Sequence, residues 1–290
     1  MDRLRQAVGA ALGSPVRSSW TVRGGDVAQA FGYDLDDDRR VFAKTHPNPP
    51  AGFFTTEANG LQWLAEAAAV HVPEVLAVSD GDALNPPFLA LEWIEVGTPR
   101  ASTEDHLGRA LARLHRATPP RFGREDRRTT GSRGLPNEPA DTWAEFYGTQ
   151  RLLPLARLAQ EAAAVSTRAI AALERVADPA RLAGFGAADE PPARLHGDLW
   201  AGNRLVDVGG QSWLIDPAAH GGHREFDLAM MRLFGGFGDD CFAAYADVHP
   251  LADGWRDRVP LHQLAPLVVH AIKFGGGYVG AAEAAIARCA

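Results

Sequence analysis

The spacing of apolar and polar positions changes about a third of the way along the chain. After a short amphipathic N-terminal helix, residues 18–45 alternate between apolar and polar positions with intervening turns, a pattern typical of strands. Apolar residues at helical spacing then predict a helix over 55–69, and apolar runs predict strands over 75–78 and 88–97. After these strands, the apolar residues recur at helical spacing. The pattern therefore predicts an α+β protein whose strand-rich part comes first.

The second part of the chain is predicted to be mainly helical. A helix begins near Ser102, where Ser102 and Asp105 resemble a capping box, and it ends before Pro119 and Pro120. Further helices are predicted within 141–178 and 224–247. The intervening stretch 119–140, rich in Pro, Gly and Arg, is predicted to be a long loop, and loops of that size are often functional.

A short hairpin stands between the two helical stretches. The strands RLVD and QSWLI flank the turn at 208–210, which brings Asn203 and Asp216 to the same end of the hairpin. Asp198 lies in the loop just before it. Taken singly, each residue could belong to a polar turn or a strand end. Together they offer oxygen ligands for magnesium and a further carboxylate that could orient a hydroxyl group, which predicts phosphotransfer.

The ordered set HxDxxxxN followed by an Asp resembles the catalytic loop and metal-binding Asp of kinase-like proteins. Such a fold needs a strand lysine that holds nucleotide phosphates, an acidic partner on the next helix and a glycine turn over the phosphates. Lys44 in VFAK, Glu57 in the next helix and Gly24-Gly25 occur in that order. The short glycine turn and the absence of DFG and APE motifs argue against a protein kinase and favour a small-molecule kinase.

Composition narrows the class of protein further. The chain has 29 basic and 36 acidic residues, a net charge of −7, which disfavours a general nucleic-acid-binding role. Its two cysteines form no metal or disulfide motif, and its N-terminal apolar run is too short for a signal peptide or membrane span. We therefore expect a cytoplasmic protein that does not bind membranes.

Several segments together resemble the fructosamine-3-kinase (ketosamine-3-kinase) family. They are LGRALARLHRAT, the GS…PN…W-x-E-F-Y run, LHGDLWAGNRL, IDPAAHGGHREFDLAMMRLFGGF and KFGGGY. The resemblance implies a two-lobed, protein-kinase-like fold, with an N-lobe over 1–93 and a C-lobe over 94–290. It also implies ATP and Mg²⁺ as cofactors, and phosphorylation of the 3-hydroxyl group of ketosamines, the Amadori products of sugars and amines. The unstable 3-phosphate would then decompose and free the amine, which is deglycation.

The same resemblance implies a role for each site residue. Asp198 would be the catalytic base, Asn203 and Asp216 would bind magnesium, and His196 and Asp227 would support the catalytic loop. The nucleotide would be bound by Gly24, Gly25, Lys44, Glu57, Glu92, Trp93 and Ile94.

The acceptor side is less sharply predicted. Trp200 either stacks on the substrate or packs in the core, and Ser132 and Asn137 are expected in a loop at the mouth of the acceptor pocket. His220 and His223 lack a third ligand nearby, so a structural role is favoured over a metal site. Rival functions are a kinase of the same fold acting on an aminoglycoside, choline or homoserine, or a catalytically inert nucleotide-binding protein. We expect a monomer.

Overall fold

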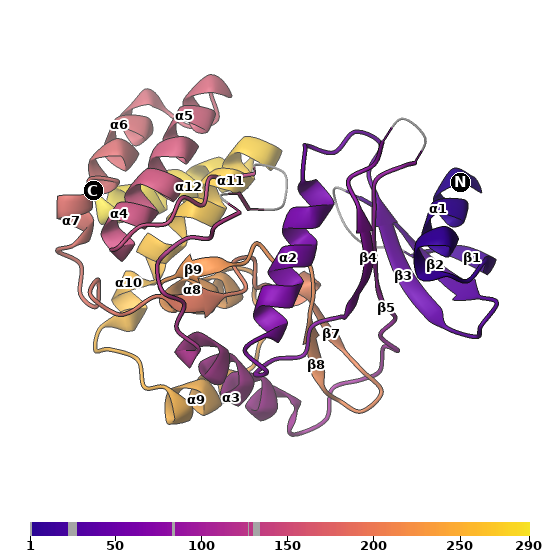
Figure 1. The fold of residues 1–290 in the computed structure, drawn as a ribbon. Helices are drawn as coiled ribbons and strands as arrows, with labels where there is room; N and C mark the ends of the chain where they lie inside the picture. Colours follow the sequence, from indigo (N-terminus) through magenta and orange to yellow (C-terminus); the bar gives the residue numbers. More distant parts are fainter. Residues whose placement is uncertain (1, 23–27, 83–84, 127, 130–133) are drawn as a thin grey trace.

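The computed structural model has a sheet-rich part followed by a helical part (Figure 1). It describes residues 2–22, 28–82, 85–126, 128–129 and 134–290. The large sheet is antiparallel, with strand order β1-β2-β3-β5-β4. Its strands are β1 (Val16–Val22), β2 (Gln29–Leu35), β3 (Arg40–Thr45), β4 (Val75–Ser79) and β5 (Phe88–Glu92). The expected α+β architecture is confirmed.

Two helices cover opposite faces of this sheet, α1 (Asp2–Leu12) and α2 (Phe53–Ala65) (Figure 1). Successive side chains of a strand point to opposite faces. On β3, Val41 accordingly belongs to the hydrophobic cluster of α1, whereas Phe42 packs against the cluster of α2. Lys44 lies two residues beyond Phe42, so the period of the strand directs it toward α2.

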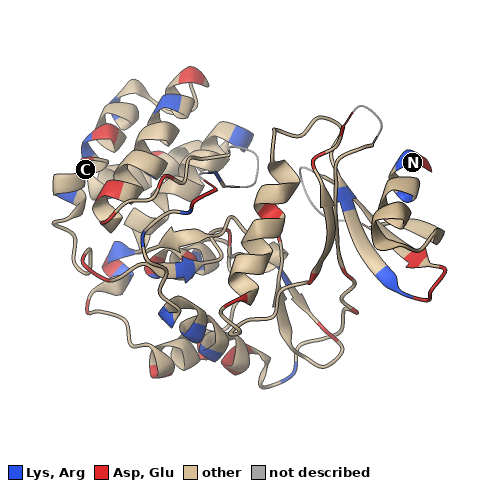
Figure 2. Ribbon diagram, in the orientation of Figure 1, with Lys and Arg blue, Asp and Glu red and all other residues tan. Residues whose placement is uncertain are grey.

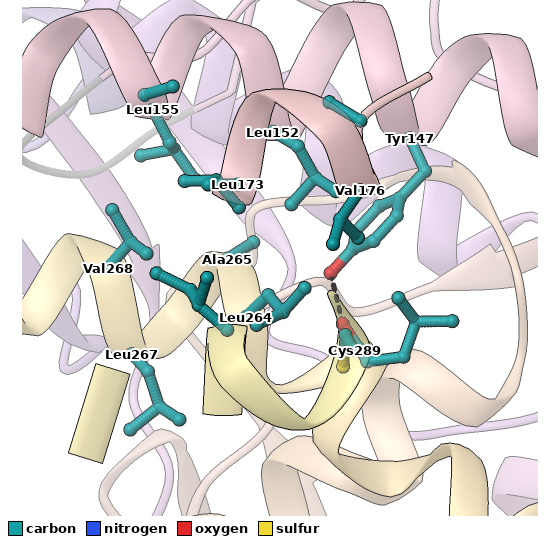
Figure 3. Close-up of a cluster of buried hydrophobic side chains, with 14 of the residues drawn as sticks. Tyr147, Leu152, Leu155, Leu173, Val176, Leu264, Ala265, Leu267, Val268 and Cys289 are labelled. Atoms are coloured by element: carbon teal, nitrogen blue, oxygen red, sulfur yellow. Dashed lines mark hydrogen bonds between the residues drawn. The ribbon is translucent and has the colours of Figure 1, made fainter. Parts of the chain in front are cut away.

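The helical part contains two hydrophobic clusters, and Figure 3 shows residues of the larger one. The hydroxyl group of Tyr147 donates a hydrogen bond to the carbonyl oxygen of Leu261 at 2.7 Å inside this cluster. Trp143 and Phe146 are buried with Tyr147, so these three aromatic residues belong to the core. The helices are α3 (Thr103–Arg116), α4 (Trp143–Tyr147), α5 (Leu153–Glu161), α6 (Thr167–Val176), α7 (Pro179–Leu182), α8 (Glu225–Phe234), α9 (Asp239–Val248), α10 (Trp255–His262), α11 (Leu264–Phe274) and α12 (Gly277–Cys289).

Two small sheets carry the segment between α7 and α8. The predicted hairpin is confirmed as β7 (Arg204–Val206) and β8 (Ser212–Leu214), with Arg204 paired to Leu214 at its open end. The second sheet was not predicted and pairs β6 (Ala193–Leu195) with β9 (His220–Gly222). The strands of this second sheet are as short as β7 and β8 but are not joined by a turn, so no local pattern in the sequence marks their pairing.

Two element boundaries differ from the sequence prediction. The strand expected over 88–97 ends at Glu92, because the chain then leaves the sheet and the N–H of Gly97 donates to the carbonyl oxygen of Val206 at 2.8 Å. The helical run after residue 141 contains a π-helical turn at Gly148–Leu152. There Gly148 packs so closely that a Cβ would lie 2.3 Å from the carbonyl oxygen of Ala177.

The capping box predicted at Ser102 is wrong. Ser102 is already in a helical conformation, and its side chain makes no capping hydrogen bond. The Thr103 hydroxyl oxygen instead accepts from the N–H of Arg100 at 2.8 Å, and the hydroxyl donates to the carbonyl oxygen of Gly210 at 2.7 Å. The start of α3 is therefore tied to the turn of the β7–β8 hairpin.

Charged residues of both signs are interspersed over the helices and the sheet (Figure 2). Across the part of the chain that the structure describes, we find no helix with the length and apolar character needed to cross a membrane.

Candidate active site

The turn His196-Gly197-Asp198 follows β6 and owes its shape to glycine. Gly197 has a φ of +80°, and a Cβ there would lie 2.1 Å from the carbonyl oxygen of Ala218. Any larger residue would force the turn away from this neighbour. Glycine therefore allows His196 to point inward while Asp198 stays at the start of the loop.

Asp227, on α8, holds this turn in place. Its carboxylate accepts hydrogen bonds from the N–H of His196 at 2.8 Å and from the N–H of Gly197 at 2.9 Å. His115 Nε2 lies 3.2 Å from the same carboxylate, and His115 Nδ1 lies 2.8 Å from the hydroxyl group of Tyr245. Burial raises the pKa of Asp227, but the hydrogen bond and charge of His115 outweigh it, so the pKa is lowered.

The ring of His196 connects the turn to the end of β8. Its Nδ1 accepts from the N–H of Asp198 at 3.3 Å, so Nε2 carries the proton and donates to the carbonyl oxygen of Ile215 at 2.9 Å. Burial lowers the pKa of this ring, in keeping with the neutral form that these two bonds require. His196 and Asp227 thus have the supporting positions that were expected of them.

The hairpin brings Asn203 and Asp216 to the catalytic turn. The N–H of Ile215 donates to the carbonyl oxygen of Asn203 at 3.0 Å, which places the two predicted metal ligands at one end of the hairpin. Asn203 Nδ2 donates to Asp198 Oδ2 at 3.0 Å and to the Asp198 carbonyl oxygen at 2.9 Å. Because the amide nitrogen is engaged with Asp198, the amide oxygen of Asn203 is the atom suited to a cation.

Asp216 has a strained backbone. Its φ is +52°, a region that residues other than glycine seldom occupy, and the following residue is Pro217. Such strain is concentrated at functional sites and persists only where the surrounding structure enforces it. Here it turns the Asp216 carboxylate toward the large sheet.

Lys44 joins the two parts of the molecule at this point. Its Nζ lies 2.5 Å from Glu57 Oε1 on α2 and 2.8 Å from Asp216 Oδ1. Both Lys44 and Glu57 are buried, at 6% and 3% exposure. A chain of polar contacts therefore runs from Glu57 through Lys44, Asp216 and Asn203 to Asp198.

Burial and neighbouring charges shift the pKa values of the residues in this series of polar contacts. Burial raises the pKa of Asp198 to about 7, although the Asn203 amide opposes the rise. Burial likewise raises the pKa of Glu57 to about 7 against the opposing charge of Lys44. Burial lowers the pKa of Lys44, but the carboxylates of Glu57 and Asp216 outweigh it, so the pKa is raised. A carboxyl group poised near neutral pH suits a general base.

Glu92, Trp93 and Ile94, which were expected to bind the nucleotide, lie at the end of β5 and just after it. The N–H of Glu92 donates to the carbonyl oxygen of Glu74 at 2.9 Å, and Glu92 Oε2 accepts from the N–H of Glu74 at 3.1 Å. Trp93 meets Trp20 edge to face at 5.4 Å between ring centroids, whereas Ile94 is buried. These contacts fix the segment that joins the sheet to the helical part.

Three predicted residues lie outside the described part of the chain. They are Gly24 and Gly25, expected to cover the phosphates, and Ser132, expected near the acceptor.

The remaining acceptor-side predictions fall in different environments. Trp200 is 38% exposed, so the alternative of burial in the core is ruled out. Asn137 is fully buried, its Oδ1 accepting from Arg151 Nη2 at 2.6 Å and its Nδ2 donating to the Arg128 carbonyl oxygen at 3.0 Å. Both polar atoms of Asn137 are engaged within the protein. Asn137, which was expected in a loop at the mouth of the acceptor pocket, therefore shapes its loop from inside, and its buried side chain does not face solvent.

Some supporting residues had no signal in the sequence. Trp63 on α2 contacts two guanidinium groups, with Arg124 at 5.3 Å and Arg194 at 4.7 Å from its ring centroid. Arg194 also donates to the Trp63 carbonyl oxygen. The helix that carries Glu57 is thereby docked on the helical part. His115 and Tyr245 were also missed, because each lies more than a hundred residues from its partner.

A buried group of His223, Glu225 and His262 has the residue types of a metal site. Arg258 Nη2, however, lies 2.6 Å from Glu225 Oε1, and His223 Nε2 lies 2.9 Å from the Ala187 carbonyl oxygen. A guanidinium group in this position repels a cation. These contacts account for the group as a structural cluster.

Comparison with known proteins assigns the chain to a family. The family model described as fructosamine kinase matches residues 2–290. A probable ketoamine kinase of Enterococcus faecium is 36% identical over 264 residues, which cover 89% of this chain and 90% of that protein. The chloroplastic protein-ribulosamine 3-kinase of Arabidopsis thaliana is 32% identical over 271 residues, covering 92% and 80%.

Solved structures agree with this assignment. A Thermobifida fusca protein assigned as a fructosamine-3-kinase has a TM-score of 0.89 and 37% identity, with coverage of 100% of this chain and 99% of that one. An aminoglycoside phosphotransferase has a TM-score of 0.61 and 18% identity, covering 99% and 97%, so it shares the fold. The expected kinase-like fold is confirmed.

Proposed function

The chain belongs to the fructosamine kinase family, and we propose that it transfers the γ-phosphoryl group of ATP to the 3-hydroxyl group of ketosamines. The observation that carries this proposal is the position of Lys44, whose Nζ contacts both Glu57 and Asp216. One ammonium group thereby connects the sheet, its covering helix and the end of the β7–β8 hairpin. Phosphoryl transfer requires this kind of positioning and charge neutralisation far more than covalent chemistry by the protein.

Asp198 acts as the general base. Its carboxylate orients the acceptor hydroxyl group and takes the proton as the oxygen attacks the γ-phosphorus. A new O–P bond forms, the bond between the γ-phosphorus and the bridging oxygen to the β-phosphate breaks, and ADP leaves. The hydrogen bond from Asn203 Nδ2 holds the Asp198 carboxylate in a fixed orientation during this step.

Asn203 and Asp216 supply the oxygen ligands that Mg²⁺ prefers, and the hairpin holds them at one end. When bound, Mg²⁺ neutralises charge on the nucleotide phosphates. The strained backbone of Asp216 supports this assignment, because it turns a carboxylate toward the same space as Lys44.

Lys44 holds the α- and β-phosphates while Glu57 keeps its ammonium group in position. Gly24 and Gly25 cover the phosphates, and the backbone at Glu92, Trp93 and Ile94 receives adenine. In this proposal the hinge separates two lobes, residues 1–93 and 94–290, that close on the nucleotide. The phosphorylated ketosamine then loses its 3-phosphate and releases the amine, which makes the enzyme a deglycating kinase. We place this activity in the cytoplasm and assign it to a monomer.

The test measures ADP release from Mg-ATP with the purified protein. The acceptors are ribuloselysine, fructoselysine and an aminoglycoside, with a reaction lacking acceptor and the Asp198→Asn variant as controls. We expect turnover with a ketosamine and its loss in the variant. Turnover with the aminoglycoside alone, or equal ADP release without acceptor, would contradict the proposal.

A further inference from the structure

Beside the catalytic loop, aromatic rings form a continuous row that the proposed chemistry does not use. We call it the aromatic ledge and define it as Trp200, Phe234, His270, Phe274 and Tyr278. From Trp200 the ring centroids are 6.1 Å apart to Phe234, then 4.8 Å to His270. From His270 they are 5.4 Å to Phe274 and 5.0 Å to Tyr278. The row therefore leads from the residue two places after Asp198 to the junction of α11 and α12.

The outer members of the aromatic ledge are open to solvent. Trp200, Phe274 and Tyr278 are 38%, 51% and 36% exposed, and they are three of the six exposed large apolar side chains in the described residues. Next to them, a Cβ built on Gly275 or Gly276 would meet no atom within 4 Å. Apolar rings gathered in this way at a site are typical of a surface that binds a ligand.

Lys273 adds a positive charge to this surface. It is one of only two lysines in the chain, the other being Lys44. Its half-buried side chain places Nζ 4.7 Å from the centroid of the Phe274 ring. The charge of Lys273 also reaches the catalytic loop, where it favours the ionised form of Asp198 and thus acts to lower its pKa. Aromatic faces and an ammonium group therefore adjoin the acceptor side of the base.

We propose, resting on the function proposed above, that the aromatic ledge and Lys273 bind the amine-bearing half of the acceptor, with Lys273 paired to a free carboxylate. The sugar hydroxyl lies at Asp198, and the remainder of the acceptor extends along the rings toward α11. A ketosamine of a free amino acid carries a carboxylate, whereas a glycated side chain within a protein has amide bonds in its place. The enzyme accordingly prefers ketosamines of free apolar amino acids.

The test compares two acceptors that differ in one group, fructosyl-phenylalanine and its carboxamide. For the wild-type chain we expect the KM of the carboxamide to be about tenfold higher, the size of one charge-assisted contact, with a similar kcat. Lys273→Met keeps most of the apolar stem and should remove this difference. Lys273→Arg should retain most of it, and Arg288→Met, which removes a charge at the far end of α12, should leave both KM values unchanged.

The possible failures can be told apart. Equal KM values for the two acceptors in the wild-type chain, or a difference that survives in Lys273→Met, would overturn the subsite while leaving the kinase intact. Absence of phosphorylation of both compounds and of ribuloselysine would overturn the proposed function and the subsite with it. Circular dichroism and ATP binding of each variant establish that it is folded.

Discussion

The proposed nucleotide side and the proposed acceptor side of the site are built differently. On the nucleotide side, Lys44 and Glu57 are 6% and 3% exposed and ion-paired. On the acceptor side, Trp200 and Phe274 are 38% and 51% exposed. A charge buried without its partner is costly, so the first region tolerates little change. Exposed rings can be exchanged cheaply, so specificity can vary there without loss of the fold.

The largest effect should come from Asp198, the proposed base. Asp198→Asn keeps the shape of the side chain but cannot accept the hydroxyl proton, so kcat should fall by about 10²- to 10⁴-fold. ATP binding should change little. ADP release under saturating ketosamine measures the effect, and Asp189→Asn, at an exposed position, is the matched control. A variant within threefold of wild type would exclude Asp198 as the base.

The next largest effect should come from Asp227, which supports the turn at residues 196–198. We expect it chiefly as a loss of stability. Asp227→Asn places an NH₂ group where the carboxylate now accepts from two backbone N–H groups and faces His115. A buried polar network broken in this way costs about 3 kcal/mol of unfolding free energy. Urea unfolding measures this cost, with exposed Asp253→Asn as the control. A urea midpoint equal to that of wild type would show that the turn does not depend on Asp227 for its stability.

Buried histidines should make the helical part sensitive to acid. Burial lowers the pKa of His220 to about 3 and of His223 to about 4. The unfolded chain binds protons near pH 6.5 while the folded rings stay neutral, so each ring costs stability as pH falls below about 6.5. Between pH 7 and pH 5 the loss is about 2 kcal/mol for each histidine.

The site carboxyl groups act in the opposite direction. Asp198 and Glu57 have raised pKa values, so the folded chain binds their protons first and gains stability as pH falls toward 4. A comparison of His223→Gln with wild type isolates the histidine contribution, because both chains share the carboxyl groups. Between pH 7 and pH 5, the free energy of unfolding measured with urea should fall by about 2 kcal/mol less in the variant than in wild type. Parallel curves would show that His223 is protonated or exposed in the native state.

The smallest effect is expected on the open side. Trp200→Ala removes a ring that is partly solvent-exposed, so stability should change by less than about 1 kcal/mol. The acceptor KM should rise about fivefold through the lost stacking contact, whereas the KM for ATP should stay constant. Trp200→Phe should recover most of the affinity. A raised KM for ATP would place Trp200 on the nucleotide side instead.

The order of elements, the hairpin and several candidate site residues could be predicted from the sequence alone. The proximity of Asn203 and Asp216 could be predicted because the start of the first strand of a hairpin lies beside the end of the second. Lys44 and Glu57 could be matched because their order along the chain, a strand lysine before an acidic residue of the next helix, resembles that of kinase-like proteins. Features of this kind can be recognised from the order and spacing of residues in the sequence.

The support of the turn at residues 196–198 and the accessibility of the acceptor-side residues, by contrast, depend on the folded chain. His115 contacts Asp227, and Arg124 and Arg194 contact the Trp63 ring, across long sequence separations that no periodicity records. Asn137 belongs to the loop interior for the same reason, since its partner Arg151 lies on another element. Contacts between distant segments depend on how whole elements pack, and packing is settled only when the chain is folded.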